Sequence, residues 1–309
     1  GTRATEGAAS LPLLGRAGEM ERLQATWAEV AAGGHRTLYL RGQAGIGKSR
    51  IMAEFAASIA EEARIIRFFA SPDAMQSPLR PIIDELEALA GFRTSDTAAE
   101  RDGRLSDLLR SAALDDPAFF AIFAEALGLP GADTHDATAL SPERRKAMLF
   151  EGLGRIVLDR AGGRPLAVIF EDLHWLDPAS LEFARHLASV MADTRSMLLG
   201  TVRPEGELIW QAATPPPVTV ELDRLEDADA IELLRLQGRV SGALDEEAIR
   251  GILERADGVP LYLEELTKSA AESRSETAIP FTLQEALMAR LDRLGQAKRI
   301  TQMAAVIGR

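Results

Sequence analysis

Residues 42–49 read Gly-Gln-Ala-Gly-Ile-Gly-Lys-Ser and satisfy the pattern GxxxxGK[ST]. A short apolar run, Thr37–Leu40, precedes this octapeptide and predicts a strand, while the helical pattern Arg50–Ala63 follows it. A strand, a glycine-rich loop and a helix in this order are the context in which the pattern binds phosphate groups. The stretch therefore predicts a phosphate-binding loop, the P-loop, and with it an α/β fold.

The residue types in the P-loop suit a polyphosphate. Glycines let the backbone turn its N–H groups toward phosphate oxygens, and the N-terminus of the following helix adds a favourable dipole. We expect Lys48 to neutralise the β- and γ-phosphates, and Ser49 to ligate Mg²⁺. The expected ligands are therefore ATP or ADP with Mg²⁺. The nucleotide-binding residues predicted here are Gly42, Gln43, Ala44, Gly45, Ile46, Gly47, Lys48, Ser49 and Arg50.

A second signal, a pair of acidic residues, follows another apolar run. Leu166–Phe170 reads as a buried strand, and the carboxylates of Glu171 and Asp172 come directly after it. In a parallel sheet this places acidic oxygens at the edge where a P-loop also lies, which is the arrangement of a Walker B motif. We assign Glu171 to Mg²⁺ and Asp172 to the attacking water, and the opposite assignment stays open.

Arg203 is a third candidate, because Met197–Val202 reads as the next buried strand and Arg203 follows it. A cation there can contact the γ-phosphate, but the spacing is equally compatible with a surface arginine. His174 and Trp175 follow the acidic pair, and His174 is interpreted as a packing or hydrogen-bonding residue and not as a catalyst. The catalytic candidates are Lys48, Glu171, Asp172 and Arg203.

The rest of the pattern alternates strands and helices, as in a parallel sheet flanked by helices. Further strands are predicted at Ile65–Phe69 and Val218–Leu222, and the extra helices between Gly91 and Pro130 read as an insertion. After Asp223 only helical patterns remain, which predicts a second, helical domain. The predicted helices are Glu19–Ala32, Arg50–Ala63, Pro81–Ala90, Arg144–Asp159, Ser180–Met191, Asp227–Leu236, Asp245–Ala256, Pro260–Ala271 and Thr282–Leu294.

Composition excludes several classes of protein. The 309 residues contain no cysteine, which excludes a disulfide framework and thiolate chemistry. A formal net charge of -12 disfavours nucleic acid as a partner, and the basic trio Arg144, Arg145 and Lys146 is interpreted as the solvated face of a helix. No run is long and apolar enough to span a bilayer, and the opening decapeptide lacks a secretory signal, so we expect a cytoplasmic protein without a membrane partner.

Several longer strings resemble the STAND class of signal-transduction ATPases, with AAA-like and NB-ARC-like modules. The likeness is strongest to the ATPase module of bacterial class III adenylate/guanylate cyclases, and LuxR-type and MalT-like regulators have similar modules. It covers nearly the whole chain. The strings that carry it are residues Leu11–Leu23, Leu40–Arg50, Ser141–Met148, Ile169–Phe183, Gly258–Lys268 and Ile279–Leu294.

The resemblance implies further site residues and a domain order. It implies that Leu14, Gly15 and Arg16 lie near the adenine, and that the Gly-x-Pro motif ending at Pro260 sits over the nucleotide and couples its state to the domain arrangement. It also implies a winged-helix-like domain after the helical one, of which AAVIGR would be part of the beginning. The expected division is a linker at 1–10, a P-loop nucleotide-binding domain at 11–222, a helical domain at 223–280 and the start of a truncated winged-helix-like domain at 281–309.

The expected function is an ATPase switch that binds ATP, hydrolyses it slowly and regulates a cyclase or other effector domain in the same parent chain. We also expect copies of this chain to associate with one another. Three alternatives stay open: a scaffold that holds nucleotide without hydrolysing it, an origin-recognition-like ATPase that binds DNA, and a small-molecule kinase.

Overall fold

The computed structural model describes residues 12–129, 140–241 and 244–272. The predicted linker at 1–10, the predicted helix Thr282–Leu294 and the predicted winged-helix segment at 281–309 lie outside the described residues. Within the described ranges, no helix has the length and apolar character needed to cross a membrane.

All five predicted strands are present, and they form one sheet in the described part of the chain. The strand that precedes the P-loop is longer than predicted at both ends, because the residues on either side of the apolar run also pair with a neighbour. The strands are β1 (His35–Gly42), β2 (Arg64–Phe69), β3 (Leu166–Glu171), β4 (Ser196–Val202) and β5 (Val218–Leu222).

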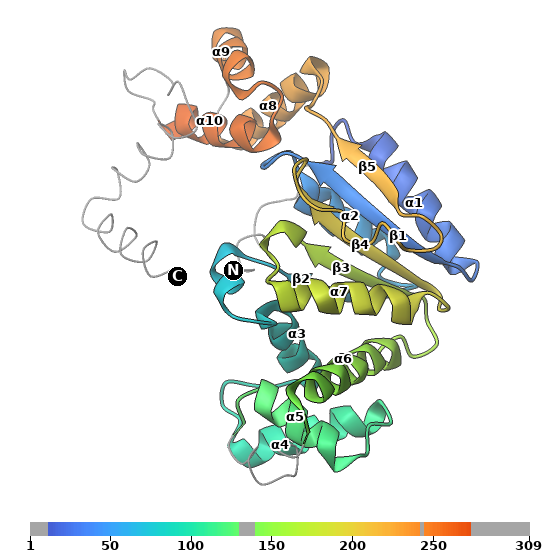
Figure 1. Ribbon diagram of the computed structural model, residues 1–309. Helices are drawn as coiled ribbons and strands as arrows, with labels where there is room; N and C mark the ends of the chain where they lie inside the picture. Colours follow the sequence, from blue (N-terminus) through green and yellow to red (C-terminus); the bar gives the residue numbers. More distant parts are fainter. Residues whose placement is uncertain (1–11, 130–139, 242–243, 273–309) are drawn as a thin grey trace. The chain divides into compact units, whose positions relative to one another are not determined.

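Helices precede the first strand, lie between most of the consecutive strands and follow the last one (Figure 1); in the described part of the chain no helix lies between β4 and β5. The helices are α1 (Ala17–Ala31), α2 (Lys48–Ile59), α3 (Arg80–Ala90), α4 (Ala98–Ser111), α5 (Pro117–Ala126), α6 (Pro142–Asp159), α7 (Pro178–Met191), α8 (Asp227–Ser241), α9 (Glu246–Ala256) and α10 (Pro260–Glu272). Two short 3-10 helices, η1 (Pro72–Gln76) and η4 (Leu173–Trp175), lie in the loops after β2 and β3.

The strand order is β2-β3-β4-β1-β5. β4 pairs in parallel with β1, where His35 is opposite Ser196, and with β3, where Leu166 is opposite the same Ser196. The chain leaves β1 toward β2 on one side and leaves β4 toward β5 on the other, so the carboxyl ends of β1 and β4 flank a topological switch point. Ligands of open α/β sheets bind at such a point, and the P-loop starts there.

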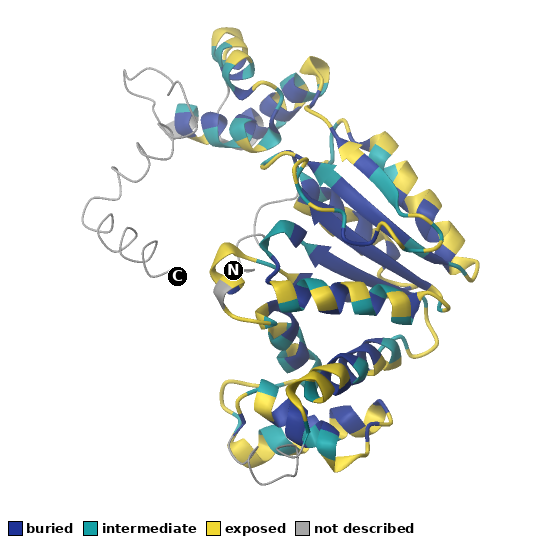
Figure 2. Ribbon diagram, viewed as in Figure 1, coloured by how far each residue is buried: buried dark blue, intermediate teal, exposed yellow. Residues whose placement is uncertain are grey.

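Burial follows the strand order (Figure 2). β4 is buried along its whole length and β3 along all but its last residue, as expected of central strands covered on both faces. β2 and β5, at the two edges, alternate between buried and more exposed residues. Figure 1 shows α7 in front of the sheet and α2 behind it. The sheet is therefore the middle layer of a three-layer α/β sandwich.

Stacked aromatic rings join β2 and β3 to the helices in front of them. The rings of Phe68 and Phe170, which are opposite each other in register, stack at a centroid distance of 4.6 Å. Phe183 of α7 meets Phe68 edge to face at 6.1 Å, and Phe150 of α6 meets Phe183 at 5.5 Å. Such aromatic geometry adds specific attraction to the burial of apolar area, so it fixes α6 and α7 against this face.

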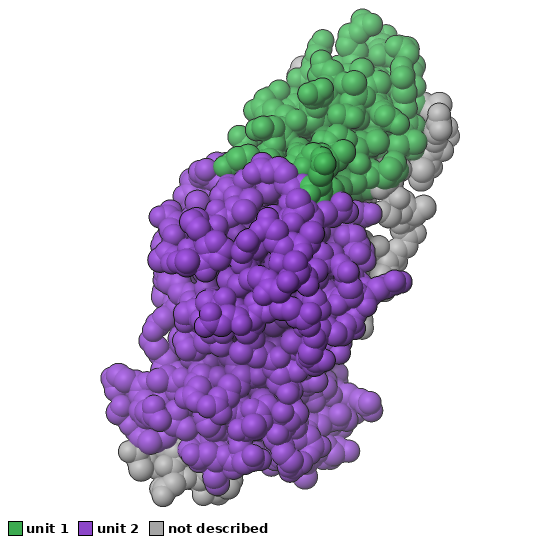
Figure 3. All heavy atoms as spheres, turned by 90° about the vertical axis from the view of Figure 1, so that its right-hand side faces the viewer, with its two compact units in different colours: residues 1–21, 42–51, 221–309 green, residues 22–41, 52–220 purple. Residues whose placement is uncertain are grey.

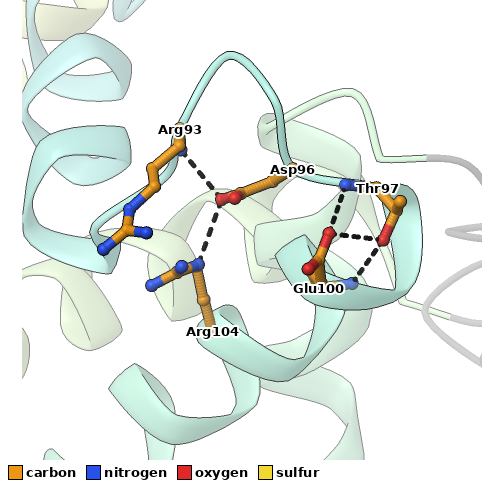
Figure 4. Close-up of polar contacts among 5 residues, drawn as sticks. All are labelled: Arg93, Asp96, Thr97, Glu100 and Arg104. Atoms are coloured by element: carbon orange, nitrogen blue, oxygen red, sulfur yellow. Dashed lines mark hydrogen bonds and ion pairs between the residues drawn. The ribbon is translucent and has the colours of Figure 1, made fainter.

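The predicted insertion contains α4 and α5, and its polar start is shown in Figure 4. Thr97 caps α4 by accepting a hydrogen bond from the Glu100 N–H, while the Glu100 carboxylate accepts from the Thr97 N–H at 2.7 Å. The Glu100 carboxylate also accepts from the Thr97 hydroxyl at 2.8 Å, and the two hydrogen bonds that it accepts from Thr97 lower the pKa of Glu100 because they favour its charged form. Just before the helix, Asp96 accepts from the Arg93 N–H at 2.8 Å and pairs with Arg104 at 3.0 Å. The capping box explains why a segment rich in charge still starts a helix at this point.

The chain divides into two compact units, coloured separately in Figure 3. One comprises residues 1–21, 42–51 and 221–309, and the other residues 22–41 and 52–220. The first unit thus combines the P-loop with α8, α9 and α10, whose buried apolar residues form a cluster of their own around Leu234 and Leu263. The domain boundaries expected from the sequence stay predictions.

Gly200 in β4 is a position where a side chain has no room. A Cβ added there would lie 2.5 Å from Leu173 Cδ1 and 2.9 Å from the Trp210 ring. Trp210 is fixed in place, because its indole N–H donates to the Ala184 carbonyl at 3.0 Å and its ring stacks on Tyr39 at 5.2 Å. The missing side chain is therefore what lets Leu173 and Trp210 approach the sheet.

We expect Gly200→Ala to lower the free energy of unfolding by about 1–3 kcal/mol, because the added methyl overpacks a rigid core. The matched control is Gly103→Ala on the exposed side of α4, where an added Cβ meets nothing within 4 Å. That change should raise stability by roughly 0.5–1 kcal/mol, since alanine favours a helix interior. Urea denaturation of both variants measures this, and equal effects at the two sites would contradict the packing account.

Candidate functional site

The P-loop adopts the backbone conformation that its glycines allow. Gly45 has φ of 77° and Gly47 has φ of 102°, values that residues with a side chain rarely adopt. α2 starts at Lys48, and the amides of Arg50 and Ile51 both donate to the Gly47 carbonyl at 3.1 Å. The loop therefore runs directly into a helix N-terminus, as the sequence predicted, and such a terminus favours a bound anion.

Lys48 is buried, and its ammonium group lies inside the loop. Nζ donates to the carbonyl of Gly42 at 2.7 Å and to that of Gln43 at 2.8 Å. In a planar trans peptide the N–H points away from the C=O. By holding these two carbonyls, Lys48 therefore turns the amides of Gln43 and Ala44 away from itself.

The surroundings of the loop fit a polyphosphate with Mg²⁺. A Cβ at Gly42 would lie 2.9 Å from Ile46 Cγ2 and 3.0 Å from the Leu222 carbonyl, so the first glycine is needed for packing. A Cβ at Gly47 would meet nothing within 4 Å, so the loop is open on that side. Ser49 is exposed at the first turn of α2, where its hydroxyl is accessible.

The start of α10 contacts the P-loop within the same compact unit. The Leu261 N–H donates to the Gly45 carbonyl at 3.2 Å, and a Cβ at Gly45 would lie 2.9 Å from Leu261 Cβ. Pro260 is the first residue of α10 and is half-buried. Just before it, Gly258 has φ of 69° and accepts a hydrogen bond from the Leu225 N–H at 2.9 Å. The Gly-x-Pro motif is therefore the turn that brings α10 to the P-loop.

The residues that precede α1 also lie beside the P-loop. Leu14 packs on the apolar cluster of α8, α9 and α10, and a Cβ at Gly15 would lie 2.6 Å from a carboxylate oxygen of Asp229. Arg16 is buried and donates to the Ile46 carbonyl at 3.2 Å. Arg50 lies 3.9 Å from the Glu264 carboxylate. The nearness of residues 14–16 to the adenine stays a prediction.

The acidic pair lies at the carboxyl end of β3, in the other unit. Glu171 is the last residue of the strand, and Asp172 has φ of 57°, which is strained for a residue with a side chain. The Asp172 N–H donates to the Thr201 hydroxyl at 2.7 Å. Thr201 comes from β4 and is fully buried, so this bond holds the backbone of the pair in place. Thr201 is the one hydroxyl residue in the apolar run Met197–Val202, which is the signal that could have identified it.

Arg203 lies just beyond the end of β4, with its guanidinium 5.3 Å from the centre of the Trp175 ring. Such a cation–π contact orients the side chain without neutralising it. A contact of Arg203 with phosphate stays a prediction. Trp175 in turn lies against the ring of His174 at 5.0 Å, which agrees with the interpretation of His174 as a packing residue.

Asp177 is a buried capping residue whose long-range contact sequence reasoning missed. It is buried, caps α7 by accepting from the amides of Ala179 and Ser180, and also accepts from the Leu79 N–H at 3.2 Å. The capping signal was the sequence Asp-Pro before a helix. Its contact with Leu79 joins the loop after η4 to the start of α3. The two residues are 98 positions apart, so no local sequence pattern predicts this contact.

Comparison with known proteins agrees with this geometry. The family model described as "AAA ATPase domain" matches residues 12–199. An uncharacterized protein of Rhizobium meliloti (strain 1021) is 29% identical over 316 residues, which cover 96% of this chain and 30% of that protein. The chain thus spans less than a third of the length of this curated relative.

Two solved structures share the fold. The Aeropyrum pernix Orc1 protein, solved in complex with DNA, is similar over 91% of this chain and 66% of its own, with a TM-score of 0.51 and 15% identity. Cdc6p from Pyrobaculum aerophilum is similar over 88% of this chain and 64% of its own, with a TM-score of 0.52 and 14% identity. At such low identity these likenesses establish the fold alone.

We expect Gly45→Ala to weaken Mg-ATP binding about tenfold or more, because the methyl is strained at positive φ and collides with Leu261. Gly128→Ala is the control, since Gly128 has φ of 63° and open space around it. It introduces similar backbone strain in the compact unit that does not contain the P-loop, and it should leave the affinity unchanged. Fluorescent-nucleotide titration measures both. Wild-type affinity in Gly45→Ala would show that the P-loop tolerates the change.

Proposed function

The chain belongs to the family of AAA ATPase domains, and from this premise we propose that it is a switch that binds Mg-ATP, hydrolyses it slowly and regulates an effector. The observation that carries the proposal is the hydrogen bond from the Leu261 N–H to the Gly45 carbonyl. It joins the loop expected to hold phosphate to α10, so a change in that loop reaches the helical segment directly.

The contacts of Lys48 supply the reason for such a change. The ammonium group of Lys48 has three N–H donors. It donates hydrogen bonds to two carbonyls of the P-loop itself, those of Gly42 and Gln43. A phosphate group carries more negative charge than a carbonyl oxygen and competes for the same ammonium. Binding of nucleotide is therefore expected to loosen the Gly42 and Gln43 contacts and to rearrange the loop, including the carbonyl that Leu261 binds.

We assign the chemical roles as follows. Lys48 and the amides of the P-loop bind and neutralise the β- and γ-phosphates. Mg²⁺, when bound with the nucleotide, supplies further charge neutralisation on the phosphate oxygens. Ser49 and one carboxylate of the pair Glu171 and Asp172 would hold it, while the other carboxylate orients the attacking water and takes up its proton. Water adds to the γ-phosphorus, the bond to the bridging oxygen breaks, and ADP and phosphate leave. Arg203 is proposed to stabilise charge on the γ-phosphate.

We further propose that this module regulates an effector domain in a longer parent chain, such as an adenylate or guanylate cyclase, and that copies of it associate. Two observations support the first of these proposals, a place in a longer parent chain. The matched segment makes up only 30% of the Rhizobium meliloti relative, so there the module is one part of a longer protein. The strings that resemble cyclase-associated ATPase modules include both the P-loop and the segment at the start of α10.

A DNA-binding role is a weaker candidate. It is suggested by the Orc1 structure, which was solved in complex with DNA. The net charge of -12 opposes a phosphate backbone. In the basic trio, Arg145 pairs with Glu125 at 3.3 Å and Lys146 with Glu182 at 2.7 Å, so part of its charge is already neutralised. We therefore favour the switch.

We expect Lys48→Ala to weaken Mg-ATP binding by about ten- to a hundredfold, because charge-assisted hydrogen bonds to phosphate are lost. Steady-state phosphate release should fall to the buffer rate. Lys268→Ala is the matched control, since Lys268 is an exposed lysine that pairs with Glu265. It should match the wild type in both assays.

Three outcomes separate the candidates. Turnover that disappears only in Lys48→Ala supports an ATPase switch. Tight binding without turnover in the wild type would assign the chain to the nucleotide-holding scaffold instead. Undiminished ATP affinity in Lys48→Ala would contradict nucleotide binding by the P-loop altogether.

A further inference from the structure

Arg16, which the resemblance places near the adenine, makes three hydrogen bonds to protein oxygens in the unit that contains the P-loop. Its side chain is buried, with 4% of its surface exposed. Nη1 donates to the Glu19 carboxylate at 2.9 Å, while Nη2 donates to the Ile46 carbonyl at 3.2 Å and to the Asp223 carbonyl at 2.6 Å. The guanidinium thus joins α1, the P-loop and the backbone that follows β5, all within one compact unit.

The contact with Ile46 sets the direction of the next amide. Because a trans peptide is planar, a carbonyl of Ile46 that faces Arg16 turns the N–H of Gly47 to the opposite side. Gly47 has φ of 102°, and a Cβ added there would meet nothing within 4 Å, so its surroundings are open. Arg16 therefore aims one of the amides that a P-loop presents to phosphate, and it does so from behind the loop.

The chemistry of this position suits arginine and not lysine. A guanidinium has five N–H donors in a fixed plane, so it can bind a carboxylate and two carbonyls at once, whereas a lysine has a single nitrogen. Glu19 supplies the opposite charge that a buried guanidinium requires. One nitrogen, Nη2, binds both carbonyls, so the P-loop peptide and the peptide at Asp223 are held together.

We propose that Arg16 is a positioning residue for the phosphates: it fixes the Ile46–Gly47 peptide toward the ligand and couples the P-loop to the segment between β5 and α8. The ligand it serves is the polyphosphate of a nucleotide, and in this respect the inference rests on the proposed function. This role differs from binding the adenine, because Arg16 donates three hydrogen bonds to protein oxygens and acts on the ligand through the P-loop.

The first test needs no ligand. Hydrogen–deuterium exchange is measured on the wild type, Arg16→Gln, Arg16→Lys and the control Arg22→Gln. Arg22 lies in α1 and donates to one backbone carbonyl, that of Thr219, and both residues belong to the compact unit that does not contain the P-loop. We expect about tenfold faster exchange at residues 46–49 and 223–226 together in Arg16→Gln, a smaller increase in Arg16→Lys, and none at these segments in Arg22→Gln.

The second test separates phosphate from adenine. Affinities for Mg-ATP and for magnesium tripolyphosphate, which lacks the base, are measured for the same proteins, with thermal unfolding as the check on folding. Arg16→Gln should weaken both ligands by the same factor, about ten- to a hundredfold. Arg16→Lys retains the positive charge but loses the planar guanidinium, so it should weaken the binding of both ligands by a smaller common factor. If Arg16→Gln does not fold, the comparison is made with Arg16→Lys alone.

Two results would overturn the proposal. Weakened Mg-ATP binding with unchanged tripolyphosphate binding would assign Arg16 to the base. Unchanged exchange at residues 46–49 in both variants would show that Arg16 does not hold the peptide. Failure of the proposed function is a separate outcome, because the wild type would then bind neither ligand, while the exchange experiment would still decide the role of Arg16.

Discussion

The parallel pairing of β4 with both β1 and β3 is the constraint on which the rest of the structure depends. It puts the carboxyl ends of three strands at one edge of the sheet. From that edge the chain continues into the P-loop after β1, into the acidic pair after β3 and into Arg203 after β4. β4 is buried along its whole length and β3 along all but its last residue, so this pairing lies in the core of the sheet.

The P-loop is held mainly by donors that bind its carbonyls. Lys48, Arg16 and the amide of Leu261 bind the carbonyls of Gly42, Gln43, Ile46 and Gly45. Each bond directs the amide of the same peptide to the opposite side. Lys48 is expected to release its two carbonyls when phosphate binds, whereas Arg16 holds the Ile46–Gly47 peptide toward the ligand before the anion arrives. This preorganisation is what a phosphate site requires, because the ordering cost is met during folding.

The sequence was sufficient to predict the five strands and the position of the P-loop, because these depend on local apolar runs and on glycine. It was not sufficient for the contacts that hold the site. The partner of Arg16 at Asp223 is 207 residues away, and the partner of the Asp172 amide is the Thr201 hydroxyl in another strand. Backbone carbonyls are present at every residue, so nothing in the sequence marks which one a buried arginine will bind.

The central claim of this account is that the nucleotide state of the P-loop reaches α10 through the bond between Gly45 and Leu261. The most direct measurement is the hydrogen-exchange rate of the Leu261 amide, recorded with the protein saturated first by Mg-ADP and then by a slowly hydrolysed Mg-ATP analogue. The account predicts different rates in the two states, because the γ-phosphate adds a second charge for Lys48 to bind. Identical rates, with binding of both nucleotides confirmed, would contradict the switch.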